Sequence, residues 1–136
     1  MATFLDTNVL VYAFDRSDER KQSVAQRLLA DTSMAVVVSA QVLNEFYWVA
    51  TRKLTPPLAE DVAQEVVHHL ARGEVVPVDA RLVEAAIGLA RCHPLSLWDA
   101  AIVIAAERAG CEVLLSDDLN DGEVVQGVTI RNPFAP

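Results

Sequence analysis

Short apolar runs alternate with stretches of helical spacing along the chain, and no other feature restricts the possible folds as strongly. Five runs have the length and β-branched content of strands, at residues 3–5, 34–38, 75–78, 113–115 and 128–130. Because these runs are continuously apolar, the strands that they predict are buried on both faces of a sheet. Such strands, separated by helices, indicate a mainly parallel sheet with right-handed crossovers.

Residues that start helices lie between the apolar runs. Four of them stand where a helix is expected to begin: Ser39, Thr55, Asp79 and Ser96. Pro56, directly after Thr55, suits a first helical turn. Pro77 places the third strand at a sheet edge or ends it. With 136 residues the chain has the length of one ordinary domain. We therefore expect a three-layer α/β/α sandwich with a mainly parallel sheet of four to five strands, formed by residues 1–136 as a single domain.

Composition and charge exclude several classes of protein. Hydrophobic residues make up 52% of the chain, with five Gly and six Pro, which excludes disordered and collagen-like chains. The sequence has no signal-peptide pattern, and its longest apolar run, residues 100–106, is far shorter than the ~18 residues of a membrane span. We expect a cytoplasmic protein without membrane contact. Cys92 and Cys111 lie in no metal-ligand spacing and are expected to be buried free thiols.

Acidic residues follow two of the predicted strands at their carboxyl ends, where open α/β sheets bind ligands. Asp6 follows the first run, and Asp117 and Asp118 follow the fourth. A doubly wound sheet can place these two strand ends side by side, although they are remote in sequence. Each acid is also explained as a turn or helix-cap residue, since Asp favours both positions.

Glu45 lies among apolar residues of the helix that follows the second run. Val42 and Val49 flank it at positions i−3 and i+4. An ionised carboxylate with such neighbours is costly unless it is paired or bound to a cation. The alternative is a glutamate at the helix rim that reaches water or pairs with Gln41 or Arg52.

Asp99 opens a helix that is apolar almost all round. The sequence SLWD, from Ser96, fits a capping box, which alone would explain the acid. The helix continues as AAIVIAA, so it is expected in the interior, with its positive end favouring an ionised carboxylate. Capping and metal binding by Asp99 are compatible.

These acids come from four separated segments, and together they indicate a particular chemistry. Closely packed carboxylates repel one another unless a cation neutralises them. Ligation by oxygen alone suits Mg²⁺ or Mn²⁺. Such a cluster fits metal-assisted attack of water on a phosphodiester, with two ions ~3.5–4 Å apart in the full arrangement. The net charge of −8 opposes binding of nucleic acid, unless a divalent cation reverses the local potential.

Four segments, in this order, resemble PIN domains, and most closely the VapC-type toxins of bacterial toxin–antitoxin pairs: FLDTNVLVYAFD, SAQVLNEFYWV, LSLWDAAIVIAA and LLSDDLNDG. The resemblance covers essentially the whole chain. It implies an α/β/α sandwich, an acidic Mg²⁺ or Mn²⁺ site, and endoribonuclease activity on single-stranded RNA. It further implies a cognate antitoxin whose tail occupies the active-site groove, and it allows a homodimer.

The resemblance also implies which acids are catalytic and bind the metal. Asp6, Glu45 and Asp99 match the first three acids of the family pattern. The fourth follows a Thr or Ser and one variable residue, so Asp118 is a better match than Asp117 or Asp121. Asp6 and Asp99 are expected to hold the principal ion, while Glu45 and Asp118 complete the site through water or a second ion.

Further residues match supporting positions or suit RNA. Thr7, Asn8 and Ser116 are expected to orient the acids, although Thr7 and Asn8 could simply cap a short helix. The candidates for RNA phosphate contacts, which are otherwise ordinary surface residues, are Arg16, Arg20, Lys21, Arg52 and Lys53. The aromatic residues that could stack on bases, but are expected to pack in the core or against a second subunit, are Tyr47, Trp48 and Trp98.

Two other functions compete with this interpretation. A catalytically silent PIN-like module would bind RNA or protein and cut neither. An aspartate-based phosphotransfer domain would need a DxDx[TV] strand end, or paired acids near the first strand with a Lys at the last. Here Asp6 is followed by Thr7 and Asn8, and the last strand reads VTIRNPF, so the sequence disfavours phosphotransfer.

Overall fold

The computed structural model describes residues 2–136, which form a six-stranded sheet in the order β3-β2-β1-β4-β6-β5. The pairs are parallel except β5 with β6. The strands are β1 (Ala2–Leu5), β2 (Ala35–Ser39), β3 (Glu74–Val76), β4 (Val113–Leu115), β5 (Val124–Val125) and β6 (Val128–Arg131). The expected α/β class with a mainly parallel sheet is confirmed.

The sheet has one strand more than the four to five expected. The extra strand, β5, is two residues long and returns to β6 through Gln126 and Gly127, whose φ angles are 53° and 76°. A strand this short carries no periodicity that a sequence pattern reveals. The expectation that Pro77 places the third strand at a sheet edge or ends it is confirmed, because β3 is an edge strand and ends at Val76, directly before Pro77.

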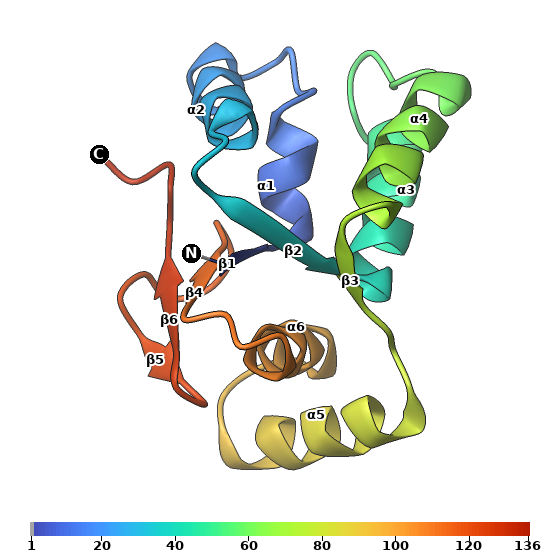
Figure 1. The fold of residues 1–136 in the computed structure, drawn as a ribbon. Helices are drawn as coiled ribbons and strands as arrows, with labels where there is room; N and C mark the ends of the chain where they lie inside the picture. Colours follow the sequence, from blue (N-terminus) through green and yellow to red (C-terminus); the bar gives the residue numbers. More distant parts are fainter. Residues whose placement is uncertain (1) are drawn as a thin grey trace.

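Helices cover both faces of the sheet and complete the three layers (Figure 1). They are α1 (Thr7–Tyr12), α2 (Glu19–Ala30), α3 (Ala40–Arg52), α4 (Glu60–Ala71), α5 (Ala80–Cys92) and α6 (Leu97–Arg108). Helices α1 to α4 lie on one side of the sheet, and α5 and α6 lie on the other. The carboxyl ends of β1 and β4, which are adjacent parallel strands, therefore open onto the junction between these two layers.

Three of the four expected helix starts are confirmed. The side chains of Ser39, Asp79 and Ser96 each accept a hydrogen bond from a backbone N–H three residues on, at 3.3, 2.8 and 3.1 Å. The prediction for Thr55 was wrong, because α4 begins only at Glu60. Pro56 precedes Pro57, and a residue before proline avoids helical backbone angles, so a helix does not start there.

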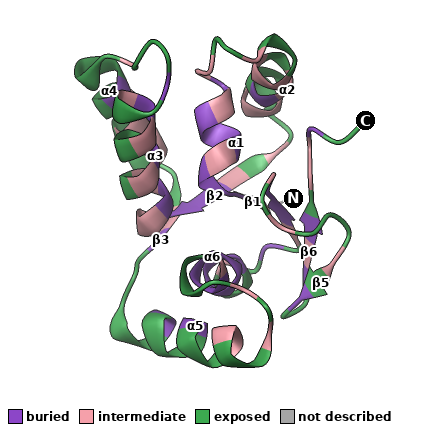
Figure 2. Cartoon of the chain, turned by 180° about the vertical axis from the view of Figure 1, so that it is seen from behind, coloured by how far each residue is buried: buried purple, intermediate pink, exposed green. Residues whose placement is uncertain are grey.

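Helix α6 lies between the sheet and α5 (Figure 1). Its residues 100–106 are all buried, and Figure 2 shows the same arrangement from behind. This placement explains a helix that is apolar on every side, and it leaves Asp99 in the first turn, near the sheet edge. No single helix of residues 2–136 is long and apolar enough to cross a membrane; α5 and α6 pass that test only as a pair bent by 119°.

The two cysteines differ in exposure. Cys111 is a buried free thiol, as expected, but Cys92 is exposed. The Cys92 thiol lies at the C-terminal end of α5 and donates to the backbone carbonyl of Gly88 at 3.0 Å. The expectation of two buried thiols was therefore wrong for Cys92, because the last turn of α5 faces solvent there.

Replacing Ile102 by Ala tests the role of α6 in stability. Ile102 is 2% exposed in α6, whereas Ile87 is 44% exposed in α5, so the same truncation removes core packing at only one site. Ile102→Ala should lower the free energy of unfolding by about 2–5 kcal/mol in urea denaturation, and Ile87→Ala by less than about 1 kcal/mol. Equal losses for the two variants would contradict the central position of α6.

Candidate active site

Asp6 is a carboxylate fixed at the junction of two strands. It directly follows β1, and its backbone N–H donates to the carbonyl of Leu115 in β4 at 3.0 Å. Its Oδ1 accepts from the backbone N–H of Thr7 at 2.7 Å, which makes it the N-cap of α1. Its Oδ2 accepts from the hydroxyl of Ser116 at 2.8 Å. The side chain is thus held at both oxygens with only 5% of the residue exposed.

The surroundings of Asp6 oppose its ionisation. Burial raises the pKa of Asp6 to about 6, although the hydrogen bonds from Ser116 and Thr7 favour the charged form. The negative charges of Asp99 and Asp118 raise it further. A carboxyl shifted this far upward by burial and like charge indicates a site that gains by binding a cation.

Asp99 enters the same region from the first turn of α6. Its backbone N–H donates to the hydroxyl of Ser96 at 3.1 Å, so Ser96 caps the helix. Burial raises the pKa of the Asp99 carboxyl, and the charge of Asp118 adds to this effect. Asp99 therefore takes part in the helix cap and in the electrostatics of the acidic region at once.

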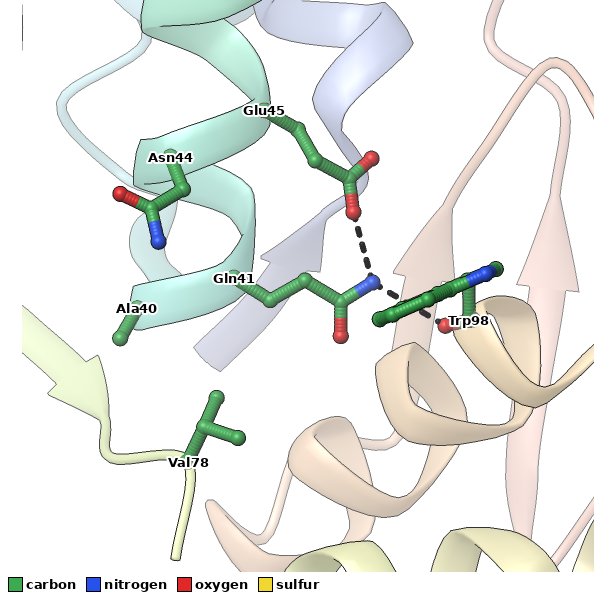
Figure 3. Close-up of a pocket in the computed structure, with 6 residues that line it drawn as sticks. All are labelled: Ala40, Gln41, Asn44, Glu45, Val78 and Trp98. Atoms are coloured by element: carbon green, nitrogen blue, oxygen red, sulfur yellow. Dashed lines mark hydrogen bonds between the residues drawn. The ribbon is translucent and has the colours of Figure 1, made fainter.

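Glu45 approaches from α3 and is held by two neighbours. Its Oε1 accepts from Nε2 of Gln41 at 2.7 Å, and its Oε2 accepts from the hydroxyl of Thr7 at 3.4 Å. Figure 3 shows the Glu45 carboxylate and the Gln41 amide pointing toward each other. Of the two alternative partners considered, Gln41 is the one observed, while the guanidinium of Arg52 stacks 4.0 Å from the Trp48 ring centroid.

The three acids after β4 point in different directions. Asp117 is bound by Nζ of Lys21 at 3.1 Å and by Nδ2 of Asn132 at 3.2 Å. Asp121 accepts from the backbone N–H of Asn132 at 2.9 Å. Asp118 instead lines a cavity of about 140 Å³ together with Asp99. The structure therefore groups Asp118, rather than Asp117 or Asp121, with the other acids.

The smaller polar residues connect these acids. Ser116, which is fully buried, donates to Asp6 and accepts from the backbone N–H of Asp118 at 3.2 Å. The Oδ1 of Asn8 accepts from the backbone N–H of Asp117 at 3.1 Å. Ser116 thus links Asp6 and Asp118 directly, and Asn8 holds the backbone at Asp117, the residue between Ser116 and Asp118.

The four acids suit a divalent cation by chemistry. Within residues 2–136 the ion pairs are Lys21–Asp117, His93–Glu123 and Arg108–Asp79, so none of the four acids is neutralised by a Lys or Arg. Their oxygen donors are those that Mg²⁺ and Mn²⁺ prefer. In the part of the chain described, no group of three or more His, Cys, Asp or Glu side chains lies close enough together to hold a metal ion, so binding one requires the carboxylates to draw closer.

The five basic residues considered for RNA binding have different environments. Arg16 is exposed, and the guanidinium of Arg20 donates to the carbonyl of Phe134 at 2.7 Å. Lys21 is engaged by Asp117, and Arg52 by Trp48. Lys53 alone among the five lines a cavity with the acids, a space of about 360 Å³ that also contacts Glu45 and Asp118.

The sequence of this chain matches a known family of domains over most of its length. The PIN-domain model matches residues 3–120, which include all four acids. The chain belongs to the PIN-domain family. A comparison with curated proteins finds no match.

Solved structures share this PIN fold. VapC20 of Mycobacterium tuberculosis, described as a toxin that cleaves the sarcin–ricin loop, is 24% identical with a TM-score of 0.68, over 82% of this chain and 86% of that chain. A toxin–antitoxin complex from Klebsiella pneumoniae is 21% identical with a TM-score of 0.70, over 96% and 97%. DNA-bound VapBC from Salmonella typhimurium is 24% identical with a TM-score of 0.65, over 98% of each chain.

The PIN domain contains site features that the sequence did not reveal. Asn132 was not considered, yet it follows β6 at the same sheet edge as Asp6 and binds Asp117. The strand-end rule that selects the acids would also have selected Asn132. Trp48 and Trp98 do not pack in the core, because they are 53% and 67% exposed, so packing against a second subunit stays a prediction.

The pKa of Asp6 predicts a pH-dependent stability of the metal-free PIN domain. Because the pKa of Asp6 is raised in the folded state, protonation of Asp6 favours folding. This contribution to the free energy of unfolding is fully present below the unfolded-state pKa and is lost as pH rises through about 6. Asp6→Asn removes this ionisation. Relative to wild type, its free energy of unfolding should rise between about pH 4 and about pH 7, by at most about 3 kcal/mol.

Urea denaturation with chelator present measures this difference. Asp31→Asn is the control, because Asp31 is an exposed residue whose pKa is lowered by hydrogen bonds from Ser33. Asp31→Asn should show no such gain at neutral pH. A stability difference between Asp6→Asn and wild type that does not change with pH would contradict the buried, charge-repelled position of Asp6.

Proposed function

We propose that this PIN domain is a Mg²⁺- or Mn²⁺-dependent endoribonuclease that cleaves single-stranded RNA, and that it is the toxin of a VapBC-type toxin–antitoxin pair. The observation that carries the proposal is the buried Asp6 carboxylate, which faces the charges of Asp99 and Asp118 without a Lys or Arg partner. The family assignment supports the same chemistry.

The catalytic roles follow from position. Asp6 and Asp99 would hold the principal ion, while Glu45 and Asp118 complete the donor set. A bound Mg²⁺ would lower the pKa of water and neutralise charge that develops on the phosphate. Ser116 and Thr7 keep the Asp6 and Glu45 carboxylates oriented through their hydroxyls, which removes rotational freedom from the donors before the substrate binds.

Lys53 is the best placed cation for the scissile strand. It lines the cavity next to Glu45 and Asp118, where an RNA phosphate can meet both its ammonium and the metal-binding acids. The net charge of −8 makes this local cation more important, because the field of the whole molecule repels RNA.

A small antitoxin and a second copy of this chain are the proposed protein partners. The compared structures include toxin–antitoxin complexes. An apolar cavity of about 420 Å³ lies between α1, α2, β2 and α4, where an apolar helix of an antitoxin would fit. Tyr47 and Trp48 expose apolar surface on α3 for self-association. A short neighbouring reading frame whose product co-purifies with this chain would test the first, and sedimentation the second.

Binding of Mg²⁺ can be measured without any substrate. The ion should raise the melting temperature of the wild-type chain because it binds the folded state, and above its Kd the shift should grow with the logarithm of the ion concentration. Ser116→Ala removes the hydroxyl that links Asp6 and Asp118, and it should weaken apparent Mg²⁺ affinity by about 10- to 100-fold. Ser33→Ala, which removes an exposed hydroxyl that donates to Asp31, is the control and should leave the affinity unchanged. No melting shift with Mg²⁺ or Mn²⁺ would contradict the metal site.

Cleavage of a mixed RNA pool tests the activity itself. Wild type should cut single-stranded RNA with Mg²⁺ and stop on addition of chelator. Asp6→Asn and Asp99→Asn should each lower the rate by about a hundredfold or more, since each loses charge that holds the ion. Asp31→Asn, the same replacement at an exposed site, should retain the wild-type rate. RNA binding by wild type without cleavage would instead support a catalytically silent PIN-like module.

A further inference from the structure

A cavity of about 770 Å³ opens beside Glu45, on the side away from Lys53. Three segments form it, namely the start of α3, the loop between β3 and α5, and the first turn of α6 (Figure 3). The residues that line it are Ala40, Gln41, Asn44, Glu45, Val78 and Trp98. Because Glu45 belongs both to this cavity and to the acidic site, a group bound here lies next to the scissile phosphate of the proposed reaction.

Trp98 is the main wall of the cavity. The residue is 67% exposed, an unusual state for the largest apolar side chain, although Asp99 beside it in the sequence is half-buried. Its position is fixed through its backbone, because Nε2 of Gln41 donates to the Trp98 carbonyl at 3.2 Å and to Glu45 at 2.7 Å. The backbone that carries the indole is thus tied to Glu45 through Gln41, while the ring itself remains free to be covered.

The remaining walls favour an uncharged, planar and partly polar occupant. Val78 is 45% exposed and provides an aliphatic surface, and the exposed Asn44 carboxamide provides both a hydrogen-bond donor and an acceptor. No Lys or Arg lines the cavity, and Glu45 would repel an anion. A phosphate therefore suits the Lys53 side of Glu45, whereas a nucleobase suits the Trp98 side.

We infer that this cavity binds one nucleobase of the RNA strand, with the Trp98 ring stacking on the base and the Asn44 carboxamide contacting its hydrogen-bonding edge. The inference rests on the proposed ribonuclease function and adds a specificity determinant to it. The strand would run from Lys53, past the acids, to Trp98. Base preference at one position next to the cut would then come from Asn44, since stacking on an aromatic ring tolerates every base.

Tryptophan fluorescence tests the stacking without requiring cleavage. The chain has two Trp residues, so Trp48→Phe leaves Trp98 as the single reporter. Titration of this variant with homopolymeric single-stranded RNA (adenylate, uridylate or cytidylate), with chelator present, should quench the emission of Trp98 in a saturable way. Absence of quenching by all three polymers would overturn the inference.

Kinetics test the effect on the reaction. Trp98→Leu should raise KM for single-stranded RNA by about tenfold to a hundredfold, with kcat nearly unchanged, and Trp98→Phe should restore most of the affinity. Asn44→Ala should broaden the base preference at one position beside the cut. Val124→Ala is the matched control, because Val124 is 61% exposed on β5, outside the cavity, and should leave KM and preference unchanged.

Failure of this inference and failure of the proposed function give different results. Quenching of Trp98 by RNA that the wild type never cleaves would support the base pocket and reject the ribonuclease. Normal cleavage by Trp98→Leu and Trp98→Phe, with unchanged KM and unchanged base preference, would reject the pocket and retain the ribonuclease. Should Trp98→Leu change only self-association in sedimentation, the ring covers a second subunit and the inference is also overturned.

Discussion

The candidate site depends on one parallel strand pairing, that of β1 with β4. Leu5 is in register with Leu115, so Asp6 and Ser116, 110 residues apart in sequence, meet at the same end of the sheet. A shift of one residue in this register would turn the Ser116 side chain to the other face and remove its bond to Asp6. The other three acids lie on elements next to this strand pair, namely α3 for Glu45, α6 for Asp99 and the loop after β4 for Asp118.

Burial of Asp6 is unfavourable to the folded chain, and other parts of the fold offset its cost. The hydrogen bonds from Thr7 and Ser116 recover part of the lost hydration of the carboxylate. Helix α6 contributes an apolar segment that is buried from residue 100 to residue 106, and the same helix carries Asp99 at its start. The element that adds most to the core therefore also positions an acid that repels Asp6. A local conflict of this kind is expected at functional sites.

The sequence was sufficient for the fold class, because continuous apolar runs indicate strands that are buried on both faces. It was also sufficient for the segments that carry the acids after β1 and β4, because an acid directly after such a run indicates the end of a strand. It could not separate Asp117 from Asp118 by physical reasoning. Adjacent residues after a strand point in different directions, and only the fold shows that Lys21 and Asn132 bind Asp117. The exposure of Trp98 was missed for a related reason. The sequence allows Trp98 to pack in the core or against a second subunit, and only the fold shows that the first turn of α6 is exposed at Leu97 and Trp98 while residues 100–106 are buried.

The distribution of charge explains how an acidic chain can be proposed to act on RNA. Several basic side chains are committed to internal contacts, such as Lys21 with Asp117 and Arg20 with the Phe134 carbonyl. With few cations left at the acids, few counterions would be released from RNA on binding, so salt would weaken the complex only slightly. Affinity would then come mainly from base stacking and from the metal ion. An aromatic ring exposed beside the acids is what such a binding mode requires, and Trp98 occupies that position.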